Sequence, residues 1–375
     1  MKIAIVQDEL VRKGGAEQVV LSFHAAFPEA PIYTLSYNSK ETYSEFKNCN
    51  IKTAWIGKII KSDTNLKRFF FPFGILAMKQ LKVTGYDVVL QSTTHCAKYV
   101  EVDDKAIVLT YCHTPFRLAW NPNSYGFILN AKTFSKRLLT SLINYLKFFD
   151  KKSAQRTDWF ITNAAEVVDR IKLAYQPKNN IEIISPPVKC KSFYVCESAK
   201  EYFLIVSRFE PYKMVDLVIK AFNGMPTKKL LIIGKGSMES ELKALANSNI
   251  QFKSNLNTVE LSKAYAESKA LIFPQHEDYG ITPLEANASG RPVIAYGFGG
   301  IRDTMIPFES HDKNSTALFF YNQTVDSITD AINKFESISF DPVFIREHAE
   351  KFDEKIFIKK IQDFVHTKYS QHRTL

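Results

Sequence analysis

Residues 270–294 read ALIFPQHEDYGITPLEANASGRPVI, which is the pattern of a strand, a loop, a helix and a second strand. The apolar run Ala270–Phe273 ends in a polar loop. A glycine turn then leads to a helix expected to start near Thr282–Pro283, because proline suits the first helical turn. The run Pro292–Ala295 is again short and apolar. Two buried strands joined by a helix are typical of a parallel sheet.

Short apolar runs alternate with amphipathic, helix-length stretches along the rest of the chain. This alternation predicts the α/β class, with two doubly wound, Rossmann-like domains. Two prolines follow a strand at Ser185–Val188, which predicts domains at residues 1–190 and 197–355, with a helix at 356–370 as a candidate to pack back on the first. The expected strands are Ile3–Val6, Ile32–Leu35, Asp87–Leu90, Ala106–Tyr111, Asp158–Thr162, Ile181–Ile184, Tyr202–Val206, Leu230–Ile233, Ala270–Phe273, Pro292–Ala295 and Ala317–Phe320.

Length and composition exclude several classes of protein. The 375 residues are 45% hydrophobic and 23% charged, as in a folded chain of more than one domain. No uncharged apolar stretch approaches the ~18 residues of a membrane-spanning helix. The first strand runs into Gln7-Asp8-Glu9 too early for a secretory signal. Five cysteines without a C-x-x-C pair fit a reducing cytoplasm and argue against a disulfide framework or a thiolate zinc site.

The net charge of +10 is concentrated in the first half of the chain. Residues 1–196 hold 27 Lys+Arg against 16 Asp+Glu, a balance of +11, whereas residues 197–375 hold 22 against 23, a balance of −1. Basic residues beside aromatic and leucine side chains are typical of an anionic membrane surface, and ordinary amphipathic helices remain the alternative. No nucleic-acid-binding signature accompanies the charge. The basic residues concerned are Lys58, Lys61, Lys67, Arg68, Lys79 and Lys82 around Phe69–Phe73, and Lys132, Lys136, Arg137, Lys147, Lys151, Lys152 and Arg156.

Two carboxylates follow the strand that ends at Phe273. Glu277 lies in the loop, and Glu285 is expected in the first turn of the following helix. The backbone N–H groups near Tyr279, Gly280 and Ile281 point out of that helix start, where they bind anions. Carboxylates accept hydrogen bonds from hydroxyls, so the segment combines groups for both halves of a sugar nucleotide. The alternative is that the two acids only complement the helix dipole.

Two further loops carry groups suited to a diphosphate. Ser207, Arg208 and Lys213 follow the strand Tyr202–Val206, and a guanidinium and an ammonium at a strand end neutralise phosphate charge. Gly14 and Gly15 begin a helix after the first strand and allow backbone N–H groups to approach an anion. The alternatives are solvated surface charges for the first loop and a plain tight turn for the second.

These motifs together resemble the retaining glycosyltransferases of family 4, which have the two-domain GT-B fold. The resemblance implies two Rossmann-like domains facing a cleft. Glu277 to Glu285 matches the E-x7-E pattern in an E-x-[FY]-G-[IL]-x-x-x-E-A-x-A-x-G-x-P-V-I context. The Gly14-Gly15 loop and the Ser207-Arg208…Lys213 loop follow in the family's order. The resemblance covers essentially the whole chain.

Within that family the block Tyr111–Trp120 is similar to O-antigen mannosyltransferases and rhamnosyltransferases. The resemblance implies that His113 is the acceptor-side catalytic histidine and that His95, Arg117 and Trp120 lie on the acceptor side. Many relatives begin with His-Asp after the first strand, where this chain has Gln7-Asp8, so Asp8 is the residue left to contribute there. The alternative is local packing by Tyr111 and Trp120.

The resemblance also implies a mechanism. Arg208, Lys213 and the Gly14–Gly15 amides would stabilise charge developing on the leaving diphosphate. Glu277 would hold donor hydroxyls and Glu285 the nucleotide ribose. No Asp-x-Asp motif stands at a strand end, so no metal or other cofactor is expected.

The function expected from the resemblance is transfer of a hexose, best guess mannose from GDP-mannose, to a lipid-linked bacterial surface glycan such as O-antigen, lipopolysaccharide or capsule. The partners implied are a nucleotide-diphosphate sugar, a lipid-linked oligosaccharide and an anionic membrane, and no nucleic acid. The expected location is the cytoplasm, peripherally on the inner face of the membrane. The alternatives are a rhamnosyl- or other deoxyhexosyltransferase using a dTDP-, UDP- or GDP-sugar, a sugar-nucleotide epimerase, and a non-catalytic binding protein.

Overall fold

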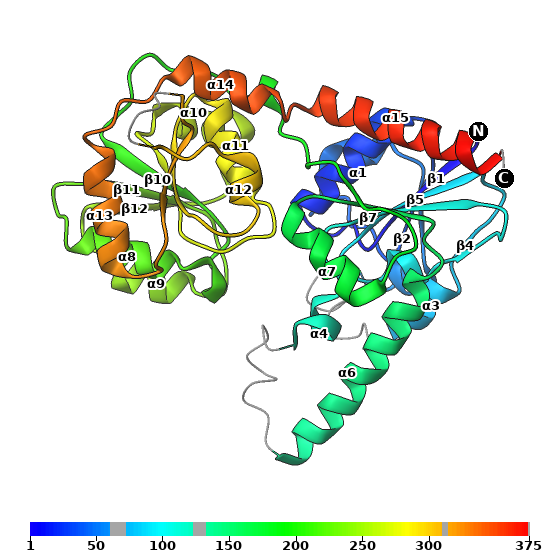
Figure 1. The fold of residues 1–375 in the computed structure, drawn as a ribbon. Helices are drawn as coiled ribbons and strands as arrows, with labels where there is room; N and C mark the ends of the chain where they lie inside the picture. The colour runs from blue at the N-terminus through cyan, green and yellow to red at the C-terminus, as the bar shows by residue number, and fades with distance from the viewer. Residues whose placement is uncertain (61–72, 123–132, 310–313, 374–375) are drawn as a thin grey trace. The chain divides into compact units, whose positions relative to one another are not determined.

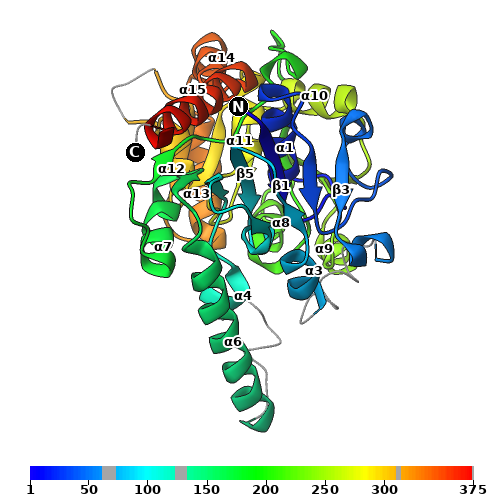
Figure 2. The same cartoon turned by 90° about the vertical axis from the view of Figure 1, so that its right-hand side faces the viewer.

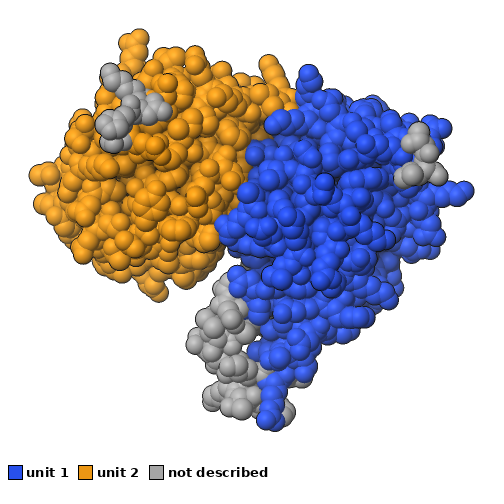
Figure 3. Space-filling model, viewed as in Figure 1, with its two compact units in different colours: residues 1–186, 357–375 blue, residues 187–356 orange. Residues whose placement is uncertain are grey.

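The computed structural model describes residues 1–60, 73–122, 133–309 and 314–373, without the side chains at 133–136 and 138. The chain forms two compact units, which Figure 3 colours separately. Unit 1 comprises residues 1–186 and 357–375, and unit 2 comprises residues 187–356. Each unit is built around its own parallel sheet (Figure 1), so the predicted class of two Rossmann-like α/β domains is confirmed.

The main sheet of unit 1 has seven strands in the order β3-β2-β1-β5-β7-β8-β9, and all its pairs are parallel. The order reverses between β1 and β5, and ligands of such sheets bind beyond the carboxyl ends of the strands at that switch point. The strands are β1 (Ile3–Gln7), β2 (Ile32–Thr34), β3 (Ile51–Thr53), β5 (Val88–Thr93), β7 (Ile107–Cys112), β8 (Trp159–Thr162) and β9 (Glu182–Ile183). A separate parallel pair joins β4 (Lys82–Val83) to β6 (Glu101–Val102).

Alternate side chains of β1 enter two different cores, because successive residues of a strand point to opposite faces. Ala4 and Val6 belong to one hydrophobic cluster, and Ile3 and Ile5 to the other. All five residues of β1 are buried, which is why its sequence is almost continuously apolar. The helices of unit 1 are α1 (Gly15–Ala26), α3 (Ile75–Lys79), α4 (Arg117–Trp120), α6 (Thr133–Ala154), α7 (Ala165–Tyr175) and α15 (Glu354–Arg373), with 3₁₀ turns η1 (Ser44–Asn48), η2 (Trp55–Lys58) and η4 (Ala97–Tyr99).

Most of the carboxyl-terminal helix α15 belongs to unit 1, from Phe357 onward. Phe357, Ile361 and Val365 are buried in the same cluster as the strand residue Ile5. The Phe357 ring stacks on Phe23 of α1 with centroids 6.0 Å apart, so the two ends of the chain share one core.

Helix α6 projects from the body of unit 1 (Figures 1 and 2). Tyr145 and Phe148 on this helix are 54% and 69% exposed, and Leu142, Leu146 and Phe149 pack inward against the cluster that contains α3. The expected basic and aromatic positions 61, 67–72 and 132 lie outside the described residues. No helix among the described residues is long and apolar enough to cross a membrane.

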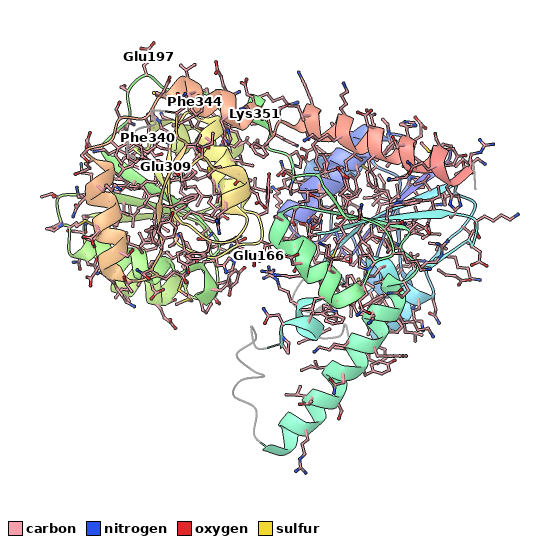
Figure 4. The ribbon with its side chains drawn as sticks, viewed as in Figure 1. Glu166, Glu197, Glu309, Phe340, Phe344 and Lys351 are labelled. Carbon is pink, nitrogen blue, oxygen red and sulfur yellow. The ribbon has the colours of Figure 1, made fainter. Side chains whose placement is uncertain are left out.

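Unit 2 contains a six-stranded parallel sheet in the order β12-β11-β10-β13-β14-β15, with its switch point between β10 and β13. Phe335 in its core stacks on Phe340, with centroids 5.4 Å apart. Figure 4 labels Phe340. The strands are β10 (Tyr202–Val206), β11 (Lys229–Ile233), β12 (Ile250–Lys253), β13 (Leu271–Phe273), β14 (Val293–Tyr296) and β15 (Ala317–Phe320). The helices are α8 (Val215–Asn223), α9 (Glu239–Leu245), α10 (Thr258–Glu267), α11 (Ile281–Ala288), α12 (Ile301–Thr304), α13 (Val325–Phe335) and α14 (Pro342–Glu350), with 3₁₀ turns η6 (Cys190–Ser192) and η7 (Pro211–Lys213).

Candidate functional site

An ion pair stands at the switch point of unit 2. The loop after β10 enters η7, which ends at Lys213, and the loop after β13 carries Glu277. The Lys213 ammonium contacts the Glu277 carboxylate, and Lys213 is 8% exposed. The structure therefore brings together two of the predicted catalytic residues, one from each of the two strands between which the order reverses.

Arg208 and Ser207 lie on the same loop as Lys213. Arg208 is exposed, and its Nη2 donates a hydrogen bond to the Tyr212 hydroxyl at 2.7 Å. The Ser207 hydroxyl donates to the backbone oxygen of Arg208 at 3.2 Å. The Lys213 ammonium lies 5.0 Å from the Tyr212 ring centroid, so one tyrosine contacts both cations. The loop thus offers an exposed and a buried positive charge side by side.

The start of α11 depends on a glycine. Gly280 has a φ of +88°, a backbone conformation that L side chains rarely adopt. A Cβ at this position would stand 2.8 Å from the Phe273 ring, so space as well as conformation requires glycine. Tyr279 is buried beside it, and Ile281 is the first helical residue, so the amides predicted to bind an anion do stand at a helix N-terminus.

Glu285 lies in the second turn of α11, which corrects the expectation that it would occupy the first. The helix starts at Ile281, earlier than the position of Pro283 indicated. Its carboxylate therefore does not complement the helix dipole; its Oε2 accepts a hydrogen bond from the Tyr265 hydroxyl at 2.7 Å. Burial raises the pKa of Glu285, and the hydrogen bond from Tyr265 opposes that rise.

Two glycine pairs allow the close backbone contacts that hold the loops of this site. A Cβ at Gly299 would collide with the backbone oxygen of Glu277, and one at Gly300 with that of Asp278. In the same way, a Cβ at Gly234 would collide with the backbone oxygen of Ser207, and Gly236 packs on the backbone of Phe209. The Gly234-Lys235-Gly236 motif after β11 was the signal available for the second pair.

In unit 1, Asp8 is a buried hub at the switch point between β1 and β5. One carboxylate oxygen accepts hydrogen bonds from the Thr93 hydroxyl and the amides of Cys96 and Ala97, and the other from Thr94 and the amide of His95. Asp8 is 1% exposed. Burial raises its pKa, but His95 and the bonds from Thr94 outweigh burial and hold the pKa well below its usual value. Asp8 thus shapes the loop that carries His95, which favours a positioning role over direct acceptor contact.

A chain of charges runs from Asp8 to the start of α1. His95 Nδ1 lies 3.1 Å from Asp8 and its Nε2 lies 3.3 Å from Glu9, which in turn accepts from Arg12 Nη2 at 2.8 Å. Arg12 Nε is 3.3 Å from the Glu17 carboxylate. Burial lowers the pKa of His95, but the charges of Asp8 and Glu9 outweigh burial and leave it raised. The sequence reasoning singled out neither Glu9 nor Arg12 nor Glu17.

The Gly14–Gly15 turn does begin a helix, but its own chain supplies an acid there. Gly14 precedes α1, and a Cβ on it would stand 2.5 Å from Glu17 Oε2. Glu17 is 1% exposed, and burial raises its pKa to about 7. The space expected for a donor anion at Gly14 is thus bordered by a carboxyl group of the protein, which favours the reading of Gly14–Gly15 as a structural turn over an open phosphate site.

Replacing Glu17 by glutamine is expected to change how stability depends on pH. Between the ordinary value of 4.5 and about 7, folded Glu17 holds a proton that the unfolded chain releases, so stability falls as pH rises through this window. The shift corresponds to about 3 kcal/mol at 1.36 kcal/mol per pH unit. Urea unfolding at pH 5 and pH 8 should show that loss in the wild type and not in Glu17→Gln. Glu241→Gln, a change at an exposed position, is the control. An equal pH dependence of all three proteins contradicts the prediction.

In the predicted acceptor block after β7, His113 and Arg117 differ from Trp120 in their surroundings. His113 Nε2 lies 2.9 Å from the Ser92 hydroxyl at the end of β5, and burial lowers its pKa to about 4 against the opposing charge of Asp8. Its imidazole is therefore neutral at pH 7. Arg117 is exposed at the start of α4. Trp120, in contrast, donates its ring N–H to Asp150 at 2.8 Å and packs on Tyr175, which favours the packing alternative for this residue.

Asp150 on α6 joins four segments of unit 1. Its Oδ1 accepts hydrogen bonds from Tyr99 and lies 2.8 Å from the Lys98 ammonium, while its Oδ2 accepts from Trp120 and Tyr175. The Asp150 side chain is fully buried, and the Lys98 side chain is 1% exposed. Lys98 also donates to the backbone oxygen of His95 at 2.6 Å. This Asp150 cluster therefore fixes both α6 and the loop that carries His95.

Among the described residues, one group of side chains has the spacing of a metal site: Asp8, His95 and Cys96. The Asp8 oxygens accept from backbone amides of the same loop, and burial raises the pKa of Cys96 well above its usual value. A protonated thiol and a carboxylate already saturated by N–H donors fit a metal ion poorly.

Comparison with known proteins finds a family model that matches most of the second unit. Residues 194–356 match the family model described as glycosyl transferases group 1. Over 96% of this chain and 90% of the relative, the sequence is 22% identical to an alpha-1,3/1,6-mannosyltransferase, ALG2, of Candida glabrata. It is 25% identical to the O-antigen chain mannosyltransferase RfbU of Salmonella typhimurium, over 52% of this chain and 58% of that protein.

A solved structure supports the fold over nearly the whole chain. The structure of Anabaena HepE in complex with UDP aligns with 98% of this chain and 100% of its own, with a TM-score of 0.70 and 13% sequence identity. At that identity the likeness concerns the fold. Together with the family match, it confirms the resemblance to the GT-B glycosyltransferases that the motifs predicted.

Proposed function

Residues 194–356 match the family model of the glycosyl transferases of group 1, and on that premise we propose that the protein is a retaining hexosyltransferase. We propose mannose from GDP-mannose as the donor, and a hydroxyl of a lipid-linked bacterial surface glycan as the acceptor. Similarity to mannosyltransferases, one of them an O-antigen enzyme, supports this choice. The observation that carries the proposal is the Lys213–Glu277 pair at the switch point of the unit 2 sheet.

In the proposed reaction the bond between the anomeric carbon and the diphosphate breaks, and the acceptor oxygen bonds to the same face of the sugar. The acceptor proton passes to the leaving phosphate, and the nucleoside diphosphate departs. Arg208 and Lys213 neutralise the charge that grows on the leaving group. His113 serves on the acceptor side as a neutral imidazole, because burial lowers its pKa.

The ion pair gives the proposed donor site a second property. Without donor, Lys213 and Glu277 neutralise each other. A diphosphate competes for the ammonium, which releases the Glu277 carboxylate to accept hydrogen bonds from hydroxyls of the sugar. Diphosphate and sugar therefore bind together more favourably than either part alone.

A panel of nucleotide sugars tests the donor. A ligand at ~100 times its dissociation constant adds roughly 2.7 kcal/mol of stability, which a thermal-shift measurement detects. We expect GDP-mannose to shift the unfolding midpoint most among GDP-, UDP- and dTDP-sugars. A larger shift with a dTDP- or UDP-deoxyhexose supports the alternative of a deoxyhexosyltransferase, and conversion of a donor without any acceptor supports an epimerase. No shift with any member contradicts the proposed function.

Transfer is expected to continue after exhaustive chelation, because we assign the diphosphate charge to Arg208, Lys213 and the amides of α11 rather than to a metal ion. The measurement is the initial rate with and without EDTA, with the same protein after addition of Mg²⁺ or Mn²⁺. Loss of activity in EDTA and recovery with either ion would show that the metal-free assignment is wrong.

We also propose that unit 1 binds the inner face of the cytoplasmic membrane. Exposed Tyr145 and Phe148 on α6 and exposed Phe73 and Leu76 at α3 are apolar groups on a unit with excess positive charge. Replacing Lys67, Arg68, Lys79 and Lys82 by serine is expected to release the protein from anionic vesicles, because each basic residue near the surface contributes about 1 kcal/mol. Salt should weaken wild-type binding in the same way.

Liposome flotation at low and high salt measures this binding. The control removes the same charge from unit 2, with serine at Lys235, Lys243, Lys253 and Lys263, and should leave binding intact. Phe148→Ser should reduce the part of the binding that resists salt, because apolar burial does not depend on ionic strength. Equal binding to neutral and anionic vesicles, or none to either, contradicts the proposal.

A further inference from the structure

Tyr265 is a buried side chain whose hydroxyl points at the second carboxylate of the E-x7-E motif. It lies in α10, one helix before the motif, and is fully buried. Its ring packs edge-on against Phe193, with centroids 5.7 Å apart. Its hydroxyl donates to Glu285 Oε2 at 2.7 Å, and this is a charge-assisted bond between a fixed ring and a longer, more flexible side chain.

The two oxygens of Glu285 consequently differ. Oε2 is occupied by Tyr265, whereas Glu285 as a residue is only partly buried. In the part of the chain that the structure describes, Tyr265 is the side chain that donates to this carboxylate, and Oε1 is left to accept from a ligand. An ionised carboxylate has no donor, so the ligand group that it selects is a donor such as a hydroxyl.

We infer that Tyr265 is a positioning residue that fixes Glu285 as the reader of one ribose hydroxyl, so that the enzyme selects nucleotides that carry this hydroxyl over analogues that lack it. The inference rests on the proposed function, in which Glu285 contacts the nucleotide ribose. A site built to bond a hydroxyl rejects an analogue without it, because the analogue leaves the polar group of the site unpaired. That rejection needs a fixed carboxylate, because a carboxylate that is free to rotate accepts hydrogen bonds from water when the hydroxyl is missing.

The inference bears directly on the donor. A dTDP-sugar lacks the 2′-hydroxyl, whereas GDP- and UDP-sugars carry both ribose hydroxyls. If Glu285 Oε1 accepts from the 2′-hydroxyl, dTDP-sugars are poor donors for this protein. If it reads the 3′-position, which all three donors have, dTDP-sugars are not excluded.

The experiment compares nucleoside diphosphates by isothermal titration calorimetry. GDP, 2′-deoxy-GDP and 3′-deoxy-GDP, and the corresponding uridine compounds, are titrated into wild type, Tyr265→Phe and Tyr202→Phe. Tyr202 is the matched control, because its hydroxyl donates to the backbone oxygen of Ala264, the neighbour of Tyr265, at 2.9 Å. Tyr202→Phe therefore removes a hydroxyl bond at α10 without touching Glu285.

We expect the wild type and Tyr202→Phe to bind the ribonucleotide about 10- to 100-fold more tightly than one of the two deoxy forms, the range that a lost hydroxyl contact typically gives. In Tyr265→Phe this ratio should fall to about threefold or less through weaker binding of the ribonucleotide, with the deoxy form little changed. A change in stability alone would weaken all nucleotides together and leave the ratio intact. Thermal unfolding of each variant verifies that it is folded.

An unchanged ratio in Tyr265→Phe, or a wild type that does not discriminate, overturns the inference and leaves the proposed function standing. If the wild type binds no nucleoside diphosphate, the proposed function itself has failed. Should Tyr265→Phe not fold, Glu285→Gln replaces it: the amide keeps the shape but presents no charged acceptor, and the ratio should fall in the same way. Full discrimination by Glu285→Gln overturns the inference.

Discussion

Replacing Lys213 by alanine is expected to lower turnover by about 10²- to 10³-fold, as does removal of a single donor from an oxyanion hole. Lys213 is 8% exposed and its ammonium stands beside Glu277, so no other cation or water replaces it easily at the diphosphate. Because the charge that it meets grows in the transition state, turnover should fall more than donor affinity. Arg208→Ala should depress turnover in the same sense. Steady-state kinetics with saturating donor measure both effects.

The control for Lys213→Ala is Lys220→Ala, which removes a lysine from an exposed i,i+4 pair with Asp216 on the next helix. Its turnover should remain close to that of the wild type. The double variant Lys213→Ala/Glu277→Gln should lose less than the two single variants would together, because residues in contact act non-additively. A rise in the Michaelis constant at unchanged turnover would show that Lys213 binds only the ground state.

Replacing Asp150 by alanine is expected to destabilise unit 1 by about 3–5 kcal/mol, the cost of leaving a buried charge without its partner. Lys98 would remain buried without a counter-ion, and the hydroxyls of Tyr99 and Tyr175 would lose their acceptor. Asp150→Asn should cost less, because the amide oxygen still accepts one or two of these bonds. Denaturant unfolding followed by tryptophan fluorescence measures the change.

Asn144→Ala is the matched control, since it truncates a side chain of similar size to alanine at an exposed position of the same helix. Its free energy of unfolding should stay within about 0.5 kcal/mol of the wild type. An Asp150→Ala protein as stable as this control would mean that α6 and the loop of His95 do not depend on the Asp150 cluster.

The fold could be predicted because each fully buried strand is a short apolar run in the sequence. The runs at Ile3–Val6 and Tyr202–Val206 are apolar without interruption, since both faces of the sheet are covered. Among the strands that were missed, β3 and β12 are edge strands with exposed residues such as Lys52 and Gln251, so their sequences lack that signal. A short strand with one solvated face has the composition of a polar loop. It is recognised only when apolar and polar residues alternate over a longer stretch.

The candidate site was predictable only where its residues follow one another in sequence. The E-x7-E segment and the loop of Lys213 were found from strand ends, but the partners of these residues come from elsewhere in the chain. Tyr265 precedes Glu285 by 20 residues, and Thr93 follows Asp8 by 85. No local pattern marks such a partner. The sequence around a buried tyrosine looks the same whether its hydroxyl bonds a distant carboxylate or its ring only packs. The start of α11 at Ile281 is likewise set by Gly280, whereas the sequence pattern placed it near Pro283.

The return of α15 to the first unit has a consequence for how the protein is made. Unit 1 leaves the ribosome first, yet its apolar surface around Phe23 and Tyr111 is covered by Phe357, which is translated only after the whole of unit 2. At about 5–20 residues per second, the intervening segment takes on the order of 10–30 s to synthesise. During that interval the nascent chain presents an open hydrophobic face while a complete domain folds behind it. Unit 1 emerges before unit 2, but its hydrophobic core is completed after unit 2 has been synthesised. Slowing translation through residues 187–356 should therefore make folding of unit 1 more dependent on chaperones.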